Sequence, residues 1–272
     1  MSCVTTRSHP QPNALLIHAP AGGNALPYQE FQSETEFIKV TLEEDSNYAR
    51  MSGKDSEKHV DLTHPIETGM QTYPGDPDVA VRSHASHDAD GYSVSSLELG
   101  SHTGAHVDAP AHVIPGGKTL AAYPVGRFVF DAARVDCRDL GPRDPVPPER
   151  IPTGDADCVV LWTGWDAHWG TATYLDHPYL SPAAARACAD RGLAVASDTL
   201  NPDPTPTAAA GDDEPDGLVA HHTLLEADCL VVENLTDLGS ATDRFELRAY
   251  PLATRRDGAP VRAVGVVPGG HA

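Results

Sequence analysis

Residues 181–198, SPAAARACADRGLAVASD, contain a helix signal followed directly by a strand signal. Ser181 is a favourable N-cap residue, and Pro182 suits the first position of a helix. The alanines that follow favour the helix interior, and Gly192 marks its end. The apolar residues of 193–198 then predict a strand. A helix that returns at once to a strand indicates an α/β fold.

Strand patterns dominate the rest of the chain. The apolar or alternating stretches that predict strands are residues 60–66, 92–100, 127–137, 157–165, 229–235, 245–252 and 261–267. A second short helix is expected at 221–228, and residues 202–217 predict a polar loop. We therefore expect one α/β domain at residues 59–272 with a mixed, strand-rich sheet. Residues 1–58 are rich in Pro, Gly, Ser and Asn and lack a sustained period, which predicts a disordered extension.

The charge of the chain limits the classes of partner. It has 39 acidic and 19 basic residues, for a formal net charge of −20. Such a surface repels nucleic acids and anionic membranes, so we expect neither as a partner. The acid excess fits adaptation to a high-salt cytoplasm or a compositional bias of the genome equally well. We find no secretory signal and no apolar run long enough to span a membrane. The five cysteines are scattered, without a CxxC pair, which favours a reducing, cytoplasmic location.

Residues 101–112, SHTGAHVDAPAH, concentrate groups that bind metal ions. In an extended chain His106 and Asp108 project from the same face about 6.6 Å apart, close enough to share an ion. His102 and His112 would each lie about 13 Å from their nearer partner in that conformation, so the chain must bend for all four to converge. Gly104 and a proline at 110 provide such bends. Imidazole with carboxylate suits Zn²⁺, Mn²⁺ or Fe²⁺, and we favour a metal site over a run of surface polar residues.

A second feature supports the metal site. Glu233 lies within the apolar stretch CLVVENL, where an unpaired carboxylate is costly. His221 begins the short helix that precedes this strand, and a helix followed by a returning strand would place the two side by side. Pairing of Glu233 with an arginine is the structural alternative.

Several motifs together resemble one family. HTGAHVDAPAH at residues 102–112 is similar to the His-x-Gly-Thr/Ala-His-x-Asp-x-Pro-x-His signature of the cyclase-like metal-dependent hydrolases, whose best-known members are bacterial kynurenine formamidases. The motifs that follow the family's order are DLTHPIETGMQTYPGDP, LWTGW, ASDTLNPDP, AHHTLLEADCLVVENL and the C-terminal PVRAV. The resemblance covers about residues 59–268.

This resemblance implies a fold, ligands and an oligomeric state. The family fold is a swivelling β/β/α domain, commonly a homodimer with part of the substrate pocket near the subunit interface. One or two Zn²⁺ or Mn²⁺ ions per subunit are implied, with Asp108 able to bridge them, and His112 matches the histidine placed as acid/base. The implied metal ligands are His102, His106, Asp108, His221 and Glu233.

The expected reaction is hydrolysis of a small-molecule amide by metal-activated water, with His112 moving the proton. We expect an arylformamidase-like amidohydrolase that converts N-formylkynurenine to kynurenine and formate in tryptophan catabolism. An isatin-type or other cyclic amide or lactone hydrolase, or a cyclase, is the alternative, and a non-catalytic metal-binding protein belongs to a different class. Tyr73 and Asn201 are candidate substrate-binding residues, and both depart from the Trp and Ser common in formamidases. Trp162 and Trp165 are candidates for stacking an aromatic substrate, although packing in the core is the more frequent role of such residues.

Overall fold

The computed structural model describes residues 57–269. The expected N-terminal extension lies outside the described residues except for its last two positions, and the first strand begins at Lys58. Within the described part of the chain, eight strands form one sheet in the order β1-β12-β11-β5-β7-β9-β10-β4, and β12 also pairs with β4. The members of this sheet are β1 Lys58–Asp61, β4 His106–Asp108, β5 Val129–Asp136, β7 Cys158–Trp162, β9 Ala194–Ser197, β10 Val231–Glu233, β11 Arg244–Pro251 and β12 Gly258–Val267.

The pairing of β4 with both β10 and β12 closes seven of these strands into a barrel. The central pairs β5–β7, β7–β9 and β9–β10 are parallel, whereas the remaining pairs are antiparallel. The expectation of a mixed, strand-rich α/β sheet is therefore confirmed. Parallel neighbours require a crossover between them, and the helices α3 (Pro182–Ala189) and α4 (Val219–Glu226) lie in two of these crossovers.

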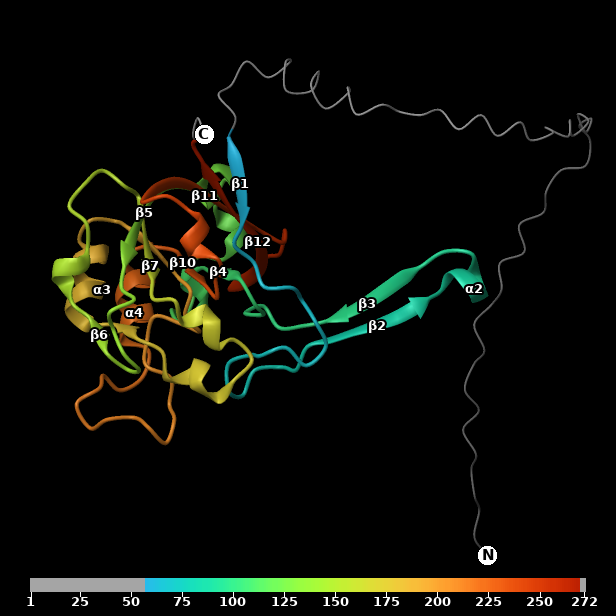
Figure 1. Ribbon diagram of the computed structural model, residues 1–272, viewed down its shortest axis with the longest axis horizontal. Helices are drawn as coiled ribbons and strands as arrows, with labels where there is room; N and C mark the ends of the chain where they lie inside the picture. Colours follow the sequence, from blue (N-terminus) through green and yellow to red (C-terminus); the bar gives the residue numbers. More distant parts are fainter. Residues whose placement is uncertain (1–56, 270–272) are drawn as a thin grey trace, which may run out of the picture. The chain divides into compact units, whose positions relative to one another are not determined.

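Alternation along the strands separates two cores. Val160, Ala196 and Val232 belong to the cluster that fills the barrel, together with Phe130 and Leu247. Their neighbours point to the opposite face because successive strand residues alternate, and there they pack against α3 and α4. This outer cluster includes Val159, Val195, Val231, Ala184, Cys188, Leu224 and Leu225. The two helices therefore cover one outer face of the barrel (Figure 1).

Helix α3 forms as its sequence predicts. The Ser181 side chain accepts a hydrogen bond from the Ala184 backbone N–H at 3.2 Å, and Pro182 occupies the first turn. The helix ends at Ala189, and Gly192 takes a left-handed φ of 67° in the turn to β9. The four cysteines in the described range, Cys137, Cys158, Cys188 and Cys229, are buried free thiols, in keeping with the expected absence of a disulfide framework.

Apart from β4, which closes the barrel, the elements that the sequence patterns did not predict lie at the periphery. Strands β2 (Ala80–Ala85) and β3 (Val94–Glu98) form a hairpin that projects from the barrel, with the short helix α2 (His87–Asp90) at its tip (Figure 1). β3 lies within the predicted strand at 92–100, but β2 was missed. Two further short strands, β6 (Pro145–Val146) and β8 (Tyr179–Leu180), pair in parallel. Short 3-10 helices connect the rest: η1 Pro110–His112, η2 Leu120–Ala122, η3 Val125–Phe128, η4 Pro148–Arg150, η5 Trp165–His168, η6 Ala172–Asp176 and η7 Leu238–Ser240.

Candidate metal centre

The expected ligands converge on the outer face of the barrel where β4 meets β10. His106 and Asp108 both lie on β4, and Val107 between them points into the barrel core. Glu233 pairs in register with His106 across the antiparallel β4–β10 ladder, so the two side chains share a face. His221 comes from the first turn of α4, which packs over that face. The sequence-based expectation that a helix and a returning strand bring His221 beside Glu233 is confirmed in geometry.

The chain bends where the ligand-rich segment requires it. Gly104 has a left-handed φ of 58°, and the Cβ that another residue would carry there lies 3.1 Å from the Met70 side chain. Pro110 begins η1, which ends at His112. These two bends flank the three-residue strand β4, so His102 and His112 fold back toward it. The rings of His102 and His112 lie 4.0 Å apart between centroids.

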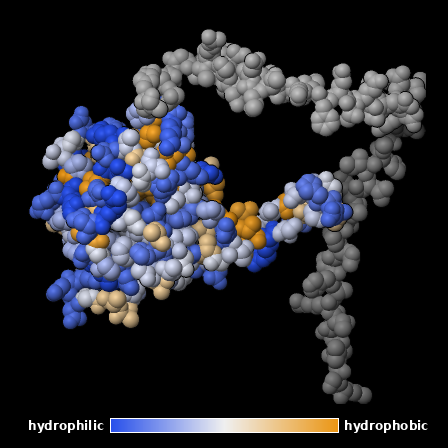
Figure 2. Space-filling view, viewed as in Figure 1, coloured by the Kyte–Doolittle hydropathy of each residue, from blue (hydrophilic) through white to orange (hydrophobic). Residues whose placement is uncertain are grey.

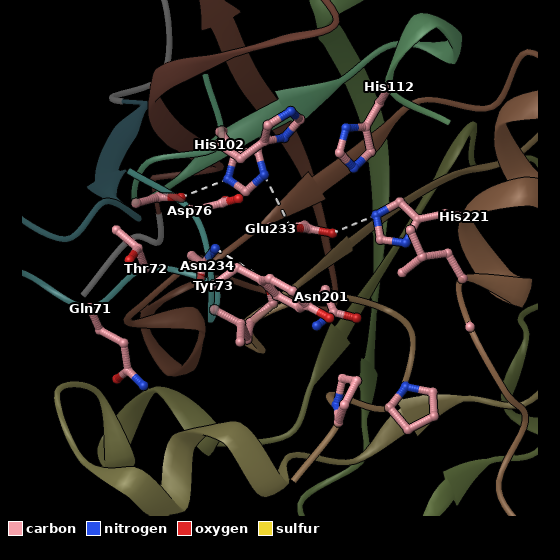
Figure 3. A pocket seen from close by; sticks show the side chains of 17 residues that line it. Gln71, Thr72, Tyr73, Asp76, His102, His112, Asn201, His221, Glu233 and Asn234 are labelled. Carbon is pink, nitrogen blue, oxygen red and sulfur yellow. Dashed lines mark hydrogen bonds and ion pairs between the residues drawn. The ribbon is translucent and has the colours of Figure 1, made fainter. Parts of the chain in front are cut away.

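Short distances connect the five candidate ligands. His106 Nε2 lies 3.1 Å from Glu233 Oε2 and 3.3 Å from Asp108 Oδ1. His221 Nε2 lies 3.1 Å from Glu233 Oε1 and 3.5 Å from Asp108 Oδ2. His102 Nδ1 lies 2.7 Å from Asp108 Oδ1. Asp108 thus presents one oxygen to His102 and His106 and the other to His221. Figure 3 shows Glu233 directed at His221.

The hydrogen-bonding state of these atoms tests whether a cation fits. Among the described residues, His106 Nε2, both Asp108 carboxylate oxygens and Glu233 Oε1 are buried without a hydrogen-bond partner. Asp108 is 0% exposed and Glu233 4% exposed. Two buried carboxylates without such partners are strongly unfavourable unless positive charge neutralises them. No arginine or lysine contacts Glu233 in the described structure, and the donor set of carboxylate and imidazole suits a divalent ion.

The pKa values of these groups also indicate that the site favours positive charge beside the carboxylates. Burial opposes ionisation of Asp108, but the charge of His106 and the close imidazole rings of His102, His106 and His221 hold the pKa of Asp108 well below its usual range. Burial alone would lower the pKa values of His106 and His221, but their contacts with the carboxylates raise both well above that of free imidazole. The two carboxylates therefore favour a positively charged partner. Without a metal ion, the imidazole rings of His106 and His221 supply that charge.

Partners on the outer ring nitrogens fix the orientation of the ligand histidines. His106 Nδ1 donates to the Gly104 carbonyl at 2.8 Å, which leaves Nε2 to face the carboxylates. His221 Nδ1 lies 2.7 Å from Asp203 Oδ2, and Asp203 also accepts the backbone N–H groups of Ala220 and His221. Asp203 was not predicted as a site residue. It lies in the polar loop 202–217, far from α4 in sequence, and no local pattern signals that contact.

His112 lies beside the expected ligands, and one of its ring nitrogens is within 4.8 Å of ligand atoms of Asp108 and His221. Its ring centroid is 5.4 Å from that of His221, and its side chain is 26% exposed at the edge of the cavity. Burial lowers the pKa of His112 from the usual imidazole value, although nearby Asp108 opposes the shift. A neutral imidazole next to a metal site is suited to accept a proton near neutral pH.

A cavity of about 260 Å³ opens over the candidate ligands. Its lining combines the candidate acid/base and ligands with apolar side chains such as Leu200 and Leu218, and both predicted substrate-binding residues, Tyr73 and Asn201, take part (Figure 3). Trp162 and Trp165 do not line this cavity. Trp162 stacks against Arg134 and Arg138, and Trp165 is 6% exposed in a small apolar cluster, so both have packing roles.

The polar atoms of Asn201 are engaged within its own loop. Its side-chain amide donates to Thr205 Oγ1 at 3.0 Å, and its Oδ1 accepts the Asp203 backbone N–H at 2.8 Å. Asn201 therefore shapes the cavity floor and holds Asp203 near His221. Its role as a direct substrate ligand stays a prediction.

Comparison with known proteins agrees with this centre. Residues 60–204 match the family described as putative cyclase. The kynurenine formamidase of Salinibacter ruber is 34% identical over 216 residues, which cover 75% of this chain and 95% of that protein. The chain belongs to the cyclase family.

Solved structures of similar fold extend this result. A crystal structure of an isatin hydrolase bound to the product analogue thioisatinate matches with a TM-score of 0.69 and 23% identity, covering 83% of this chain and 97% of that one. A structure described as a potential metal-dependent hydrolase with cyclase activity matches with a TM-score of 0.63 and 24% identity, covering 78% and 98%. The cyclase-family chain thus has the fold that was expected from its motifs.

Proposed function

We propose that the chain is a metal-dependent amide hydrolase of the arylformamidase type, which converts N-formylkynurenine to kynurenine and formate. The observation that carries the proposal is the position of His112, a neutral imidazole at the edge of a cavity whose floor consists of unpartnered carboxylate and imidazole atoms. The similarity to the kynurenine formamidase of Salinibacter ruber supports the choice of substrate.

His102, His106, Asp108, His221 and Glu233 would hold one or two divalent ions. We favour Zn²⁺ or Mn²⁺ because both accept imidazole and carboxylate ligands. Ions bound there supply Lewis acidity, which lowers the pKa of a water molecule and polarises a carbonyl group. Asp108 is the residue suited to both ions, since its two oxygens face different histidines.

His112 moves the proton in the proposed reaction. The attacking water loses a proton to His112 at Nε2, because Nδ1 of this ring faces Asp257. As water oxygen joins the formyl carbon, the bond between that carbon and the substrate nitrogen breaks. His112 returns the proton to the leaving nitrogen, which becomes the amine of kynurenine. The formic acid that departs ionises to formate by releasing its remaining proton to solvent. No serine or cysteine nucleophile is needed, since water supplies the attacking oxygen.

Tyr73 and Leu200 supply a wall for an aromatic substrate. Tyr73 is partly buried at the cavity edge, and its ring can pack against the aryl group of a formylanilide. Asn201 shapes the adjoining floor. Both residues depart from the types common in formamidases, so a cyclic amide such as isatin is the second candidate, and the fold similarity to an isatin hydrolase supports its inclusion in the assay.

Purified protein is assayed with N-formylkynurenine and with isatin after loading with Zn²⁺ or Mn²⁺ and after chelation, at low and molar salt. We expect chelator-sensitive release of kynurenine, and the better metal identifies the native ion. If the protein hydrolyses isatin but not N-formylkynurenine, the proposed substrate is wrong and the proposed mechanism stands. Turnover of neither amide by protein that binds metal would favour a non-catalytic metal-binding role.

The proposed setting is the cytoplasm, where the enzyme would act in tryptophan catabolism as a homodimer without nucleic-acid or membrane partners. The net charge of −20 disfavours polyanions. Among residues 57–269, no helix has the length and apolarity needed to cross a membrane.

The hairpin β2–β3 supports the proposed dimer. Every residue of β3 is exposed, including Leu97 at 58% and Val94 at 43%. Apolar surface is visible along this hairpin in Figure 2. The middle of this two-stranded hairpin is exposed on both faces, which makes it marginally stable alone, and a second copy would cover it. Light scattering after gel filtration tests this proposal: we expect a dimer for the wild type and dissociation for Leu97→Glu, with Glu98→Gln as control. A monomeric wild type would contradict it.

A further inference from the structure

Asp257 approaches the centre from a part of the chain that no sequence motif singled out. It directly precedes β12, and its Oδ2 lies 2.7 Å from His102 Nε2. The same oxygen lies 3.6 Å from His112 Nδ1, slightly beyond hydrogen-bond distance. One carboxylate oxygen therefore faces both a candidate metal ligand and the proposed acid/base.

The contact with His102 completes a pattern shared by all three ligand histidines. In each ring one nitrogen faces Asp108 or Glu233, and the other nitrogen meets an oxygen outside the ligand set. These outer oxygens are the Gly104 carbonyl for His106, Asp203 Oδ2 for His221 and Asp257 Oδ2 for His102. Such outer partners fix the tautomer and the ring plane of a metal-binding histidine.

The backbone holds Asp257 firmly in this position. Its carbonyl accepts the Ala109 N–H at 2.7 Å, and the next residue, Gly258, pairs in register with Asp108. A Cβ at position 258 would lie 2.7 Å from His102 Cε1, closer than non-bonded carbons approach. Glycine is thus required for β12 to pass against the His102 ring, and that close passage brings the Asp257 carboxylate to His102 Nε2.

We propose that Asp257 is a positioning residue that orients both His102 and His112. Its hydrogen bond with His102 Nε2 directs Nδ1 of that ring toward Asp108. Its negative charge beside His112 Nδ1 directs Nε2 of that ring toward the cavity. The part that concerns His112 rests on the proposed hydrolase function, whereas the part that concerns His102 requires only the metal centre.

The two parts are separated by comparing Asp257→Ala with Asp257→Asn. The alanine variant removes both contacts, so we expect metal affinity and kcat each to fall by about 10–100-fold. The asparagine variant keeps an oxygen that can accept from His102 but loses the charge beside His112. It should therefore recover most of the metal affinity while kcat stays low and KM is nearly unchanged. Asp243→Asn, at an exposed ion pair with Arg134, is the matched control.

Two readouts distinguish positioning from a structural role or from direct ligation. Titration with Zn²⁺ gives affinity and stoichiometry, and long-range ¹H–¹⁵N NMR of the zinc-loaded protein reports which His102 nitrogen carries the proton. We expect Nε2–H in the wild type and in Asp257→Asn, and a mixture in Asp257→Ala. Unchanged affinity, tautomer and kcat in Asp257→Ala would overturn the proposal, as would loss of a whole ion from the stoichiometry. Metal titration and NMR need no substrate, so they remain decisive for His102 even if the wild type hydrolyses neither amide.

Discussion

Two clusters of buried polar side chains lie next to each other in this molecule, and they differ in how their hydrogen bonds are satisfied. In the loop cluster, defined as His177, Asn201, Asp203 and Thr205, each side chain has a partner within the chain. In the ligand cluster of β4, β10 and α4, four buried atoms have none. The two clusters are equally buried, so burial alone does not reveal a metal site. Convergent carboxylate and imidazole atoms without hydrogen bonds do, because these atoms are the donor set of a divalent ion.

Removal of a ligand should have the largest effect. His106→Ala and Asp108→Ala are each expected to abolish metal binding and hydrolysis, because each deletes a donor at the middle of the ligand cluster. Metal content by mass spectrometry and turnover of N-formylkynurenine measure the two effects. His84→Ala on the exposed hairpin strand β2 is the matched control. Activity retained in metal-free His106→Ala protein would refute the mechanism.

Loss of the acid/base should leave the ligand cluster intact. His112→Ala is expected to retain most of its metal while kcat falls by about 10²–10⁴-fold, the usual contribution of general acid–base catalysis. Metal stoichiometry and steady-state kinetics on the same preparation test this separation. If the metal is lost together with activity, His112 is a ligand.

Acid should destabilise the loop cluster through His177. Burial lowers the pKa of His177 to about 4, whereas the unfolded chain has the ordinary value near 6.5. Between these values the unfolded state binds the proton and the folded state does not, so stability falls as pH falls from about 6.5 to 4. The total loss from this group is about 3 kcal/mol. Urea unfolding of metal-free wild type and His177→Gln between pH 4 and 7 measures it, and equal slopes in the two proteins would contradict the assignment.

Metal binding should raise the melting temperature through the ligand cluster alone. An ion that binds only the folded state stabilises it by about 2.7 kcal/mol at 100 times its Kd. We expect the melting temperature to rise with Zn²⁺ in the wild type and to stay constant in Asp108→Ala. A shift of equal size in both proteins would place the stabilising ion elsewhere.

The smallest effect is expected from a single substitution in the loop cluster, Thr205→Val. Thr205→Val removes the hydroxyl group that contacts Asn201 and His177, at nearly constant volume. Stability should fall by about 1–3 kcal/mol, the cost of leaving buried polar groups unpaired. Metal content should remain at the wild-type level. Thr242→Val at an exposed turn is the control, and a loss of metal in Thr205→Val would mean that the two clusters are not independent.

Local patterns sufficed for part of this architecture. The helix at 182–189 and the strands around it follow from capping residues and apolar alternation, and the bends at Gly104 and Pro110 follow from residue type. Asp203 and Asp257 could not be found in this way. Asp257 reaches His102 only after the chain has returned from a distant element, and Asp203 reaches His221 across the long loop before α4. An aspartate in a polar loop has the same local signature whether or not it orients a ligand. The hairpin strand β2 was missed because only its end residues, Ala80 and Ala85, are buried, so it shows no alternation of apolar and polar residues.

Strand β4 has a consequence for the order in which the molecule matures. His106 pairs with Glu233 on one side and with Pro260 on the other, so the strand that carries two ligands is also the seam at which the barrel closes. During synthesis, β4 is made before both of its partner strands, β10 and β12, so His106 and Asp108 first emerge without His221 and Glu233. The ligand set is complete once β10 has paired with β4, and pairing with β12 closes the barrel. Retention of the ion then reports that α4 and β10, made long after β4, have reached it.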